Sequence, residues 1–383
     1  MHRSKDRVLT THVGSLPRDS ELTALIFAKD SGADYDHAAF EACVAKSVNA
    51  VVARQVDAGI DLVSDGEMSK ISYATYVAER LTGFDGNAPR SVPWDLEDYP
   101  SYRDKISQAG DTPKLKRPCC VGEVTLRDTA PLERDLENIK AAMAASKPLG
   151  AFMNAASPGV VSVFQPNRHY PDDDAYLEAL GNALRQEYER IAAAGITLQI
   201  DSPDLAFGRH VIFKHLSDEE FVVRAERQAE VLNHALANIP PDQVRLHICW
   251  GNYEGPHTHD IPLEKVYAVL MKLRAQYILF EASNPRHAHE WTVFRDRGVP
   301  EDKVLVPGVI DSTTNFVEHP KLVAERILRY ADIVGRERVM AGADCGFSTF
   351  AGFGRIDPEI CYAKLKTLSD GAAIASDHLW RRG

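Results

Sequence analysis

The chain has 383 residues, 44% of them hydrophobic, with a formal net charge of −11 and a pI near 5.7. It can bury a large core, and its acidic balance argues against a nucleic-acid or anionic-membrane surface. No apolar run approaches the ~18 residues of a membrane span, and the first residues lack the apolar stretch of a signal peptide.

Strand-like segments alternate with helical patterns along most of the chain. The expected strands lie at 10–15, 60–67, 151–157, 196–201, 244–249, 277–283, 303–311 and 338–345. The expected helices lie at 38–58, 174–195, 218–237, 263–274, 286–297, 319–334 and 357–376. Strands that alternate with helices in this way predict an α/β protein, specifically a (β/α)₈ or TIM barrel.

A ninth strand-like segment, at 118–126, follows an irregular stretch at 84–117 that is rich in Pro, Asp and Tyr. Because such a barrel has eight strands, we assign this segment to an excursion after the second strand, with a small hairpin. The helical pattern at 133–146 then leads back to the third barrel strand. We therefore predict a single catalytic barrel domain over 1–383, with an insertion at about 84–130.

The six cysteines show no spacing typical of a disulfide scaffold, so we expect a reducing compartment, the cytoplasm. Two of them belong to the most informative pattern in the chain. His247 and Cys249 are two residues apart in one expected strand and so point to the same side. Glu281 and Cys345 arrive at the ends of two later strands.

Two thiolates, an imidazole and a carboxylate suit Zn²⁺ better than Mg²⁺ or Ca²⁺. The alternative is that these cysteines are core residues, since free cysteine is often buried and H-x-C alone is a weak motif. Their place at strand ends favours the metal, because active sites lie at the carboxyl ends of barrel strands.

A zinc with this ligand set would carry a net charge of about −1, from the ligands in their metal-bound forms. Such a centre activates water poorly, but it lowers the pKa of an incoming thiol while leaving the sulfur nucleophilic. Glu281, the hardest ligand, is the one that a thiolate would displace. The ligand set therefore favours alkyl transfer to sulfur over hydrolysis.

Two H-x-H pairs are weaker metal candidates. His257 and His259 follow the strand that contains His247, and His287 and His289 open a predicted helix. Residues two apart on a helix do not share a face, so we expect solvated or substrate-contacting histidines instead. Many other polar groups lie at the expected strand ends and call for a cation or a positively charged substrate group, among them His12, Asp65, Glu67, Asp201, Asp311 and Asp344.

In order and spacing, several segments resemble the catalytic barrel of the cobalamin-independent methionine synthase family, within the uroporphyrinogen decarboxylase/methionine synthase-like superfamily. The similarity runs from residue 10 to about 375 and is to the short, single-barrel members. The segments that carry it are TTHVGSLPR (10–18), DGE (65–67), LQIDSPDLA (198–206), HIC (247–249), FEAS (280–283), GVID (308–311) and ADCGF (343–347).

The resemblance implies a (β/α)₈ fold and Zn²⁺ bound by His247, Cys249, Glu281 and Cys345. It also implies a homocysteine-like site with two recognition elements. Ser15 and the neighbouring backbone of Val13 and Gly14 would hold a carboxylate, and Glu67 and Asp201 would hold an ammonium group. A structural ion pair or a helix cap is the alternative for those two acids.

Asp311 and Thr313 are the expected catalytic residues at the end of the GVID strand. Thr313 stands where the resemblance implies a histidine that assists proton transfer to a departing pterin. Aromatic and basic features for a polyglutamated folate are not evident in the sequence. The donor is therefore left open between methyltetrahydrofolate, a methylated corrinoid or corrinoid protein, and another activated methyl compound.

The leading hypothesis is zinc-dependent methyl or alkyl transfer to a small thiol, with homocysteine as the acceptor and methionine as the product. The alternative is a thiol–epoxide ligation that resembles epoxyalkane:coenzyme M transferase, which would need a basic group such as Arg18 or Arg54 for the sulfonate. A decarboxylase without zinc and a zinc-storage protein fit less well. A homo-oligomer is compatible with the sequence.

Overall fold

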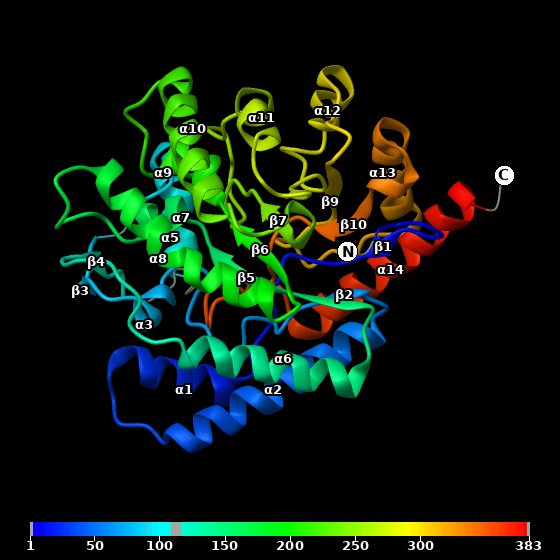
Figure 1. Cartoon of the computed structure of the whole chain (residues 1–383). Coiled ribbons are helices and arrows are strands. Elements are labelled where there is room, and N and C mark those ends of the chain that lie inside the picture. The colour runs from blue at the N-terminus through cyan, green and yellow to red at the C-terminus, as the bar shows by residue number, and fades with distance from the viewer. Residues whose placement is uncertain (1–2, 90, 109–115, 381–383) are drawn as a thin grey trace.

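In a computed structural model, eight parallel strands form a nearly closed barrel (Figure 1). The structure describes residues 3–89, 91–108 and 116–380. The strand order is β1-β10-β9-β8-β7-β6-β5-β2, and the Asp61 amide donates to the Thr10 carbonyl (3.2 Å) where β1 meets β2. The barrel prediction is confirmed. The strands are β1 Leu9–Thr10, β2 Leu62–Val63, β5 Gly150–Ala156, β6 Thr197–Asp201, β7 Val244–His247, β8 Tyr277–Phe280, β9 Val304–Ile310 and β10 Met340–Ala343.

Helices surround the barrel on all sides (Figure 1). Several begin where the sequence offers a capping side chain: Asp36 accepts from the Ala39 amide before α2, and Ser217 with Glu220 forms a capping box before α10. No helix in the described ranges is long and apolar enough to span a bilayer. The outer helices are α2 His37–Asp57, α6 Ala130–Ser146, α8 Asp173–Ala193, α10 Asp218–Ala235, α11 Leu263–Met271, α12 Trp291–Arg297, α13 Pro320–Val334 and α14 Pro358–Trp380.

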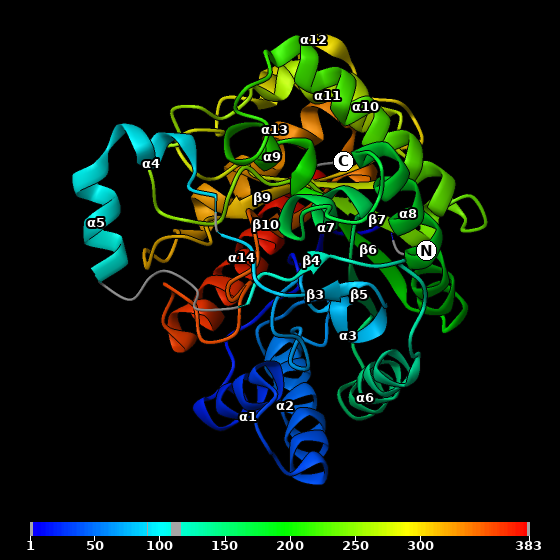
Figure 2. The same ribbon diagram turned by 90° about the vertical axis from the view of Figure 1, so that its left-hand side faces the viewer.

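The excursion after the second barrel strand contains a two-stranded antiparallel ribbon, as expected. In it, β3 (Phe84–Asp85) pairs with β4 (Cys119–Cys120). The connection between them is not wholly irregular, however, because it contains α4 (Trp94–Asp98) and α5 (Pro100–Gln108). These two helices extend away from the barrel (Figure 2). The division of the chain into one domain over 1–383 stays a prediction.

Apolar side chains pack in two layers, one between strands and helices and one inside the barrel. Arg245 from β7 crosses the interior layer. Its guanidinium lies 3.7 Å from the centre of the Phe152 ring and donates to the Thr11 hydroxyl and the His12 carbonyl. The interior is therefore a packed core, as barrel interiors are, and the space for chemistry lies at its carboxyl end.

A buried ion cluster fixes the start of the excursion to the outer helices. Arg80, at the end of α3 (Val77–Arg80), pairs with Asp135 of α6 at 2.5 Å and with Glu187 of α8 at 2.7 Å. All three side chains are 5% exposed. The two carboxylates hold the pKa of Arg80 above its ordinary value against the cost of burial, so the cluster is charged.

Candidate active site

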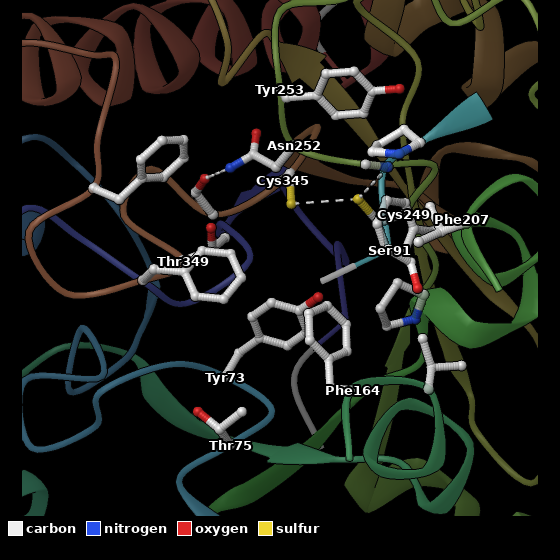
Figure 3. A pocket seen from close by; sticks show the side chains of 18 of the residues that line it. Tyr73, Thr75, Ser91, Phe164, Phe207, Cys249, Asn252, Tyr253, Cys345 and Thr349 are labelled. Atoms are coloured by element: carbon white, nitrogen blue, oxygen red, sulfur yellow. Dashed lines mark hydrogen bonds between the residues drawn. The ribbon is translucent and has the colours of Figure 1, made fainter. Parts of the chain in front are cut away.

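Three residues from two strand ends converge at the carboxyl end of the barrel. His247 ends β7, Cys249 follows it by two residues, and Cys345 follows the end of β10 by two. The two sulfurs are 3.6 Å apart (Figure 3), and one ligand atom of each residue lies within 4.8 Å of the others. This geometry is that of a site able to hold a metal ion.

The chemistry of the three groups fits a soft divalent cation. His247 is 3% exposed, and neither of its ring nitrogens has a hydrogen-bond partner. Burial, aided by Arg245, lowers the pKa of His247 to about 3, so its imidazole is neutral, the form that binds metals. The bond to Cys345, with burial, raises the pKa of Cys249 well above its usual range, because two adjacent sulfurs cannot both ionise without a cation.

Glu281 is not part of this three-residue group. It directly follows β8, but one carboxylate oxygen accepts from the Trp250 amide (2.8 Å) and the other from the side chain of Asn284. Asp344 holds the same loop by accepting the amides of residues 282–284 at 2.8–2.9 Å. The expected fourth ligand therefore lies in the right region, with its oxygens turned to protein donors.

The histidines at 257 and 287 converge on Asp260 and not on a metal. Nδ1 of His257 and Nε2 of His287 each lie 2.9 Å from the same Asp260 oxygen. Against the cost of burial, Asp260 raises the pKa of His257 to about 9 and of His287, with Glu290, to about 10. These are charged structural groups, as is typical of buried imidazoles between carboxylates.

Glu67 and Asp201 lie together in the wall of the main cavity. Glu67 follows Gly66 in a turn where both have positive φ (58° and 68°), and its Oε2 is buried without a hydrogen-bond partner. Asp201 ends β6 and accepts from Asn154 (2.8 Å) and Gln199 (2.9 Å). Among the described residues neither acid forms an ion pair or caps a helix, so both are available to a ligand in the cavity.

Burial sets the electrostatics of this acid pair. It raises the pKa of Glu67 to about 8, opposed by Lys70 and assisted by Asp201. It raises the pKa of Asp201 to about 6, opposed by its two amide donors. A cation that binds beside two buried carboxyl groups with raised pKa values stabilises their charged forms, so this part of the cavity favours a cationic ligand group.

The segment from residue 13 to 15 lies beside these acids. Val13 and Ser15 line the cavity, while the Val13 carbonyl accepts from Asn154 and Gln199. Gly14 has φ 135°, and a Cβ there would lie 2.2 Å from an Asn154 side-chain atom. Because this backbone lies so close to the Asn154 side chain of β5, position 14 requires glycine.

Asp311 and Thr313 do not line the cavity. Asp311 accepts from the Thr313 amide and hydroxyl and from the Thr314 hydroxyl, at 2.6–3.0 Å. Its carboxylate therefore shapes its own loop. The catalytic assignment of both residues stays a prediction, without support from this geometry.

The cavity has a volume of about 430 Å³ and extends from the sulfurs to the excursion. The sequence interpretation missed its aromatic wall and basic side chains, because they come from loops and from the unexpected helices. Tyr73 could have been suspected, since it follows Glu67 by six residues in the same loop. The aromatic wall consists of Tyr73, Phe164, Phe207, Phe350 and Phe353, Tyr253 lines the cavity as well, and the basic residues are Arg103, Lys116, Arg117 and Arg355.

The model of the family described as the catalytic domain of cobalamin-independent synthases matches residues 8–354. The chain belongs to this family. It is 24% identical to a methionine synthase of Saccharolobus solfataricus, with 98% of this chain and 96% of the relative covered. A methionine synthase of Sulfurisphaera tokodaii is 23% identical over 98% of this chain and 94% of its own length.

Solved structures agree on the fold. A B12-independent methionine synthase from Shewanella sp. W3-18-1, solved in complex with selenomethionine, matches with a TM-score of 0.75 and 20% identity, over 98% of this chain and 99% of that one. A putative vitamin-B12-independent methionine synthase from Listeria monocytogenes matches with a TM-score of 0.64 and 19% identity, over 96% of this chain and 98% of that one. Because the family of this chain is described as cobalamin-independent, it lends no support to a corrinoid donor.

Proposed function

We propose that this family member is a zinc-dependent S-methyltransferase that converts homocysteine to methionine. One observation carries the proposal: a metal-binding group with two sulfurs and an unpartnered buried carboxylate line the same cavity. The first suits a thiol and the second an ammonium group, and homocysteine carries both.

His247, Cys249 and Cys345 would hold the zinc, because a neutral unpartnered imidazole and two adjacent sulfurs match its ligand preferences. Glu281 is the proposed fourth ligand, for which its carboxylate would have to leave Asn284 or the Trp250 amide. Bound Zn²⁺ would lower the pKa of the acceptor thiol, so that the thiol reacts as a thiolate.

The chain's own residues place the acceptor. Glu67 and Asp201 would bind its ammonium group, with Asn154 orienting Asp201. Ser15 and the backbone of Val13 and Gly14 would bind its carboxylate. The aromatic wall excludes water from the thiolate, which keeps the sulfur poorly solvated and nucleophilic.

Neither basic residue expected for the coenzyme M alternative is available to a sulfonate. The Arg18 guanidinium already donates to the backbone carbonyls of Glu67, Lys70 and Ser348. Arg54 pairs with Glu359 elsewhere on the protein. A sulfonate would instead meet the carboxylate of Asp201, and like charges in a buried site repel strongly.

X-ray absorption of the zinc-loaded protein tests the proposal. Homocysteine should raise the number of sulfur neighbours from about two to about three, and coenzyme M should not. The matched control ligand is 4-mercaptobutanoate, which lacks the amine and should bind more weakly. Glu67→Gln should remove the difference between these two ligands. Sulfur addition by coenzyme M alone would favour the epoxide reaction and contradict the proposal.

A further inference from the structure

Five aromatic side chains form a continuous wall of the cavity that Cys249 and Cys345 also line. The ring centres of Tyr73 and Phe164 are 5.6 Å apart, and Phe164 lies 6.3 Å from Phe207 and 6.4 Å from Phe350. Phe353 extends the row at 6.2 Å from Phe350. All five rings are half-buried in the described structure and line the cavity.

Figure 3 shows Tyr73 and Phe164 across the cavity from Cys249 and Cys345, with Phe207 beside Cys249. A methyl group that reacts with a thiol at the sulfurs must therefore approach from the aromatic side. Ring faces carry negative electrostatic potential and attract cations, onium groups in particular.

The groups that act on the phenol of Tyr73 are acidic. Burial raises the pKa of Tyr73 well above its usual value, and Cys249, Cys345, Asp201 and Asp204 raise it further. A cationic ligand thus gains both from the rings and from the nearby carboxylates of Asp201 and Asp204, whereas a neutral ligand of the same shape gains from neither.

Methyl transfer from a tertiary amine requires an acid, since nitrogen must be protonated to leave. In the described part of the cavity lining, the only imidazole is that of His247, which belongs to the metal group. Of the carboxyl groups, Glu67 and Asp201 face the acceptor, and Asp104 is 63% exposed on α5. The volume of about 430 Å³ suits two small substrates better than an amino acid together with a large pterin.

We propose that the methyl donor is a small onium compound with a carboxylate, a methylsulfonium or a quaternary methylammonium, whose cationic centre rests on the aromatic wall. This inference depends on the proposed function for its acceptor. The acceptor thiolate attacks the methyl carbon, and a new S–C bond forms. The bond from that carbon to the onium atom breaks, and its electron pair leaves with a neutral thioether or tertiary amine, so no proton donor is needed.

The basic side chains of the cavity account for the carboxylate. Arg103 on α5 and Lys116 before β4 line the same space as the rings. Arg117 and Arg355 line it too, but Arg117 donates to the carbonyls of Val163 and Phe164, and Arg355 pairs with Glu254. A purely cationic donor would be repelled by them, but a zwitterion can satisfy both sets of groups.

Three probes with one carboxylate isolate the charge: dimethylsulfonioacetate, trimethylammonioacetate and the neutral isostere 3,3-dimethylbutanoate. Calorimetry on the zinc-loaded protein with homocysteine bound should find an onium probe at least tenfold tighter than the isostere. Phe164→Leu should reduce that ratio by about tenfold, the effect of one desolvated cation–aromatic contact. Phe213→Leu, a half-buried phenylalanine outside the lining, should leave it unchanged.

Tyr73→Phe and Tyr73→Leu separate recognition by the ring from a structural effect. The phenylalanine variant should keep the preference for onium probes, and the leucine variant should lose it. Mass spectrometry should then find methionine formed from either the sulfonium or the ammonium probe. The probe that yields methionine shows whether the donor is a methylsulfonium or a quaternary methylammonium compound. Equal binding of onium and isostere, with homocysteine still bound, would overturn this inference alone. Failure to bind homocysteine would overturn the proposed function.

Discussion

The raised pKa of Glu67 gives a direct test of the acceptor pocket. Methionine has the ammonium and carboxylate groups of homocysteine but no thiol, so its binding reports only on the amino-acid part of the site. Burial raises the pKa of Glu67 to about 8 in the free protein. An ammonium group beside the carboxylate should bring that pKa back towards its ordinary value of 4.5.

The size of the effect follows from these two values. At pH 7 a group with a pKa near 8 is about 90% protonated, so binding should release about 0.9 of a proton. The methionine affinity should therefore rise by nearly tenfold from pH 6.5 to about 7.5 and level off above about 8.

Calorimetry in two buffers of different ionisation enthalpy measures the released proton. Glu67→Gln should abolish the release and flatten the pH dependence. Asp30→Asn, which removes a carboxyl of raised pKa on α1 (Ser20–Ser31), should change neither. Tight methionine binding at pH 7 with no proton released would refute the assignment of Glu67 to the ammonium group.

The same pKa predicts a stability effect whose sign is opposite to that of an ordinary paired carboxylate. Between pH 4.5 and about 8 the folded protein holds a proton on Glu67 that the unfolded chain has lost. The free energy of unfolding should thus fall as pH rises through this window. In urea titrations without ligand, Glu67→Gln should remove this part of the pH dependence of the free energy of unfolding. An unchanged pH dependence would contradict the raised pKa of Glu67.

Three further predictions concern the metal and the framework. Cys249→Ser should lower zinc content from about one per chain to nearly none, while Cys43→Ser in α2 should retain it; metal analysis decides. Arg80→Met should lower the free energy of unfolding by about 3–5 kcal/mol in urea titrations, because two buried carboxylates lose their partner; a loss below about 1 kcal/mol would mean that they are not charged. Gly308→Ala places a Cβ 2.1 Å from Asp344 Oδ1 and 2.5 Å from its Cα, so calorimetric unfolding should detect a loss of about 1–3 kcal/mol, and an unchanged Tm would contradict the crowding.

Strand ends were predictable because they follow from local patterns. Apolar runs bounded by helical periodicity placed the eight barrel strands, and parallel strands bring their carboxyl ends to one face. His247 and Cys249 could be paired by the two-residue repeat of a strand. Their meeting with Cys345, 96 residues beyond Cys249, followed once a closed barrel was assumed.

The direction of a side chain after its strand was not predictable. Glu281 lies at the end of the expected strand, but the direction of its oxygens depends on two donors, the Trp250 amide and the Asn284 side chain. Asp311 was expected at the chemistry, yet the hydroxyls of its own loop hold it. Such choices depend on donors that only the folded loop brings near.

By itself, the sequence determined the architecture and the cluster of soft ligands, since periodicity and strand-end position are local properties of the chain. The tertiary structure alone decided the aromatic wall and the shape of the cavity. Tyr73 and Phe350 are far apart in the sequence, and their rings meet at 5.7 Å because the loops after β2 and β10 fold over the same carboxyl end of the barrel. Loop contacts of this kind arise from packing and leave no periodic trace in the sequence.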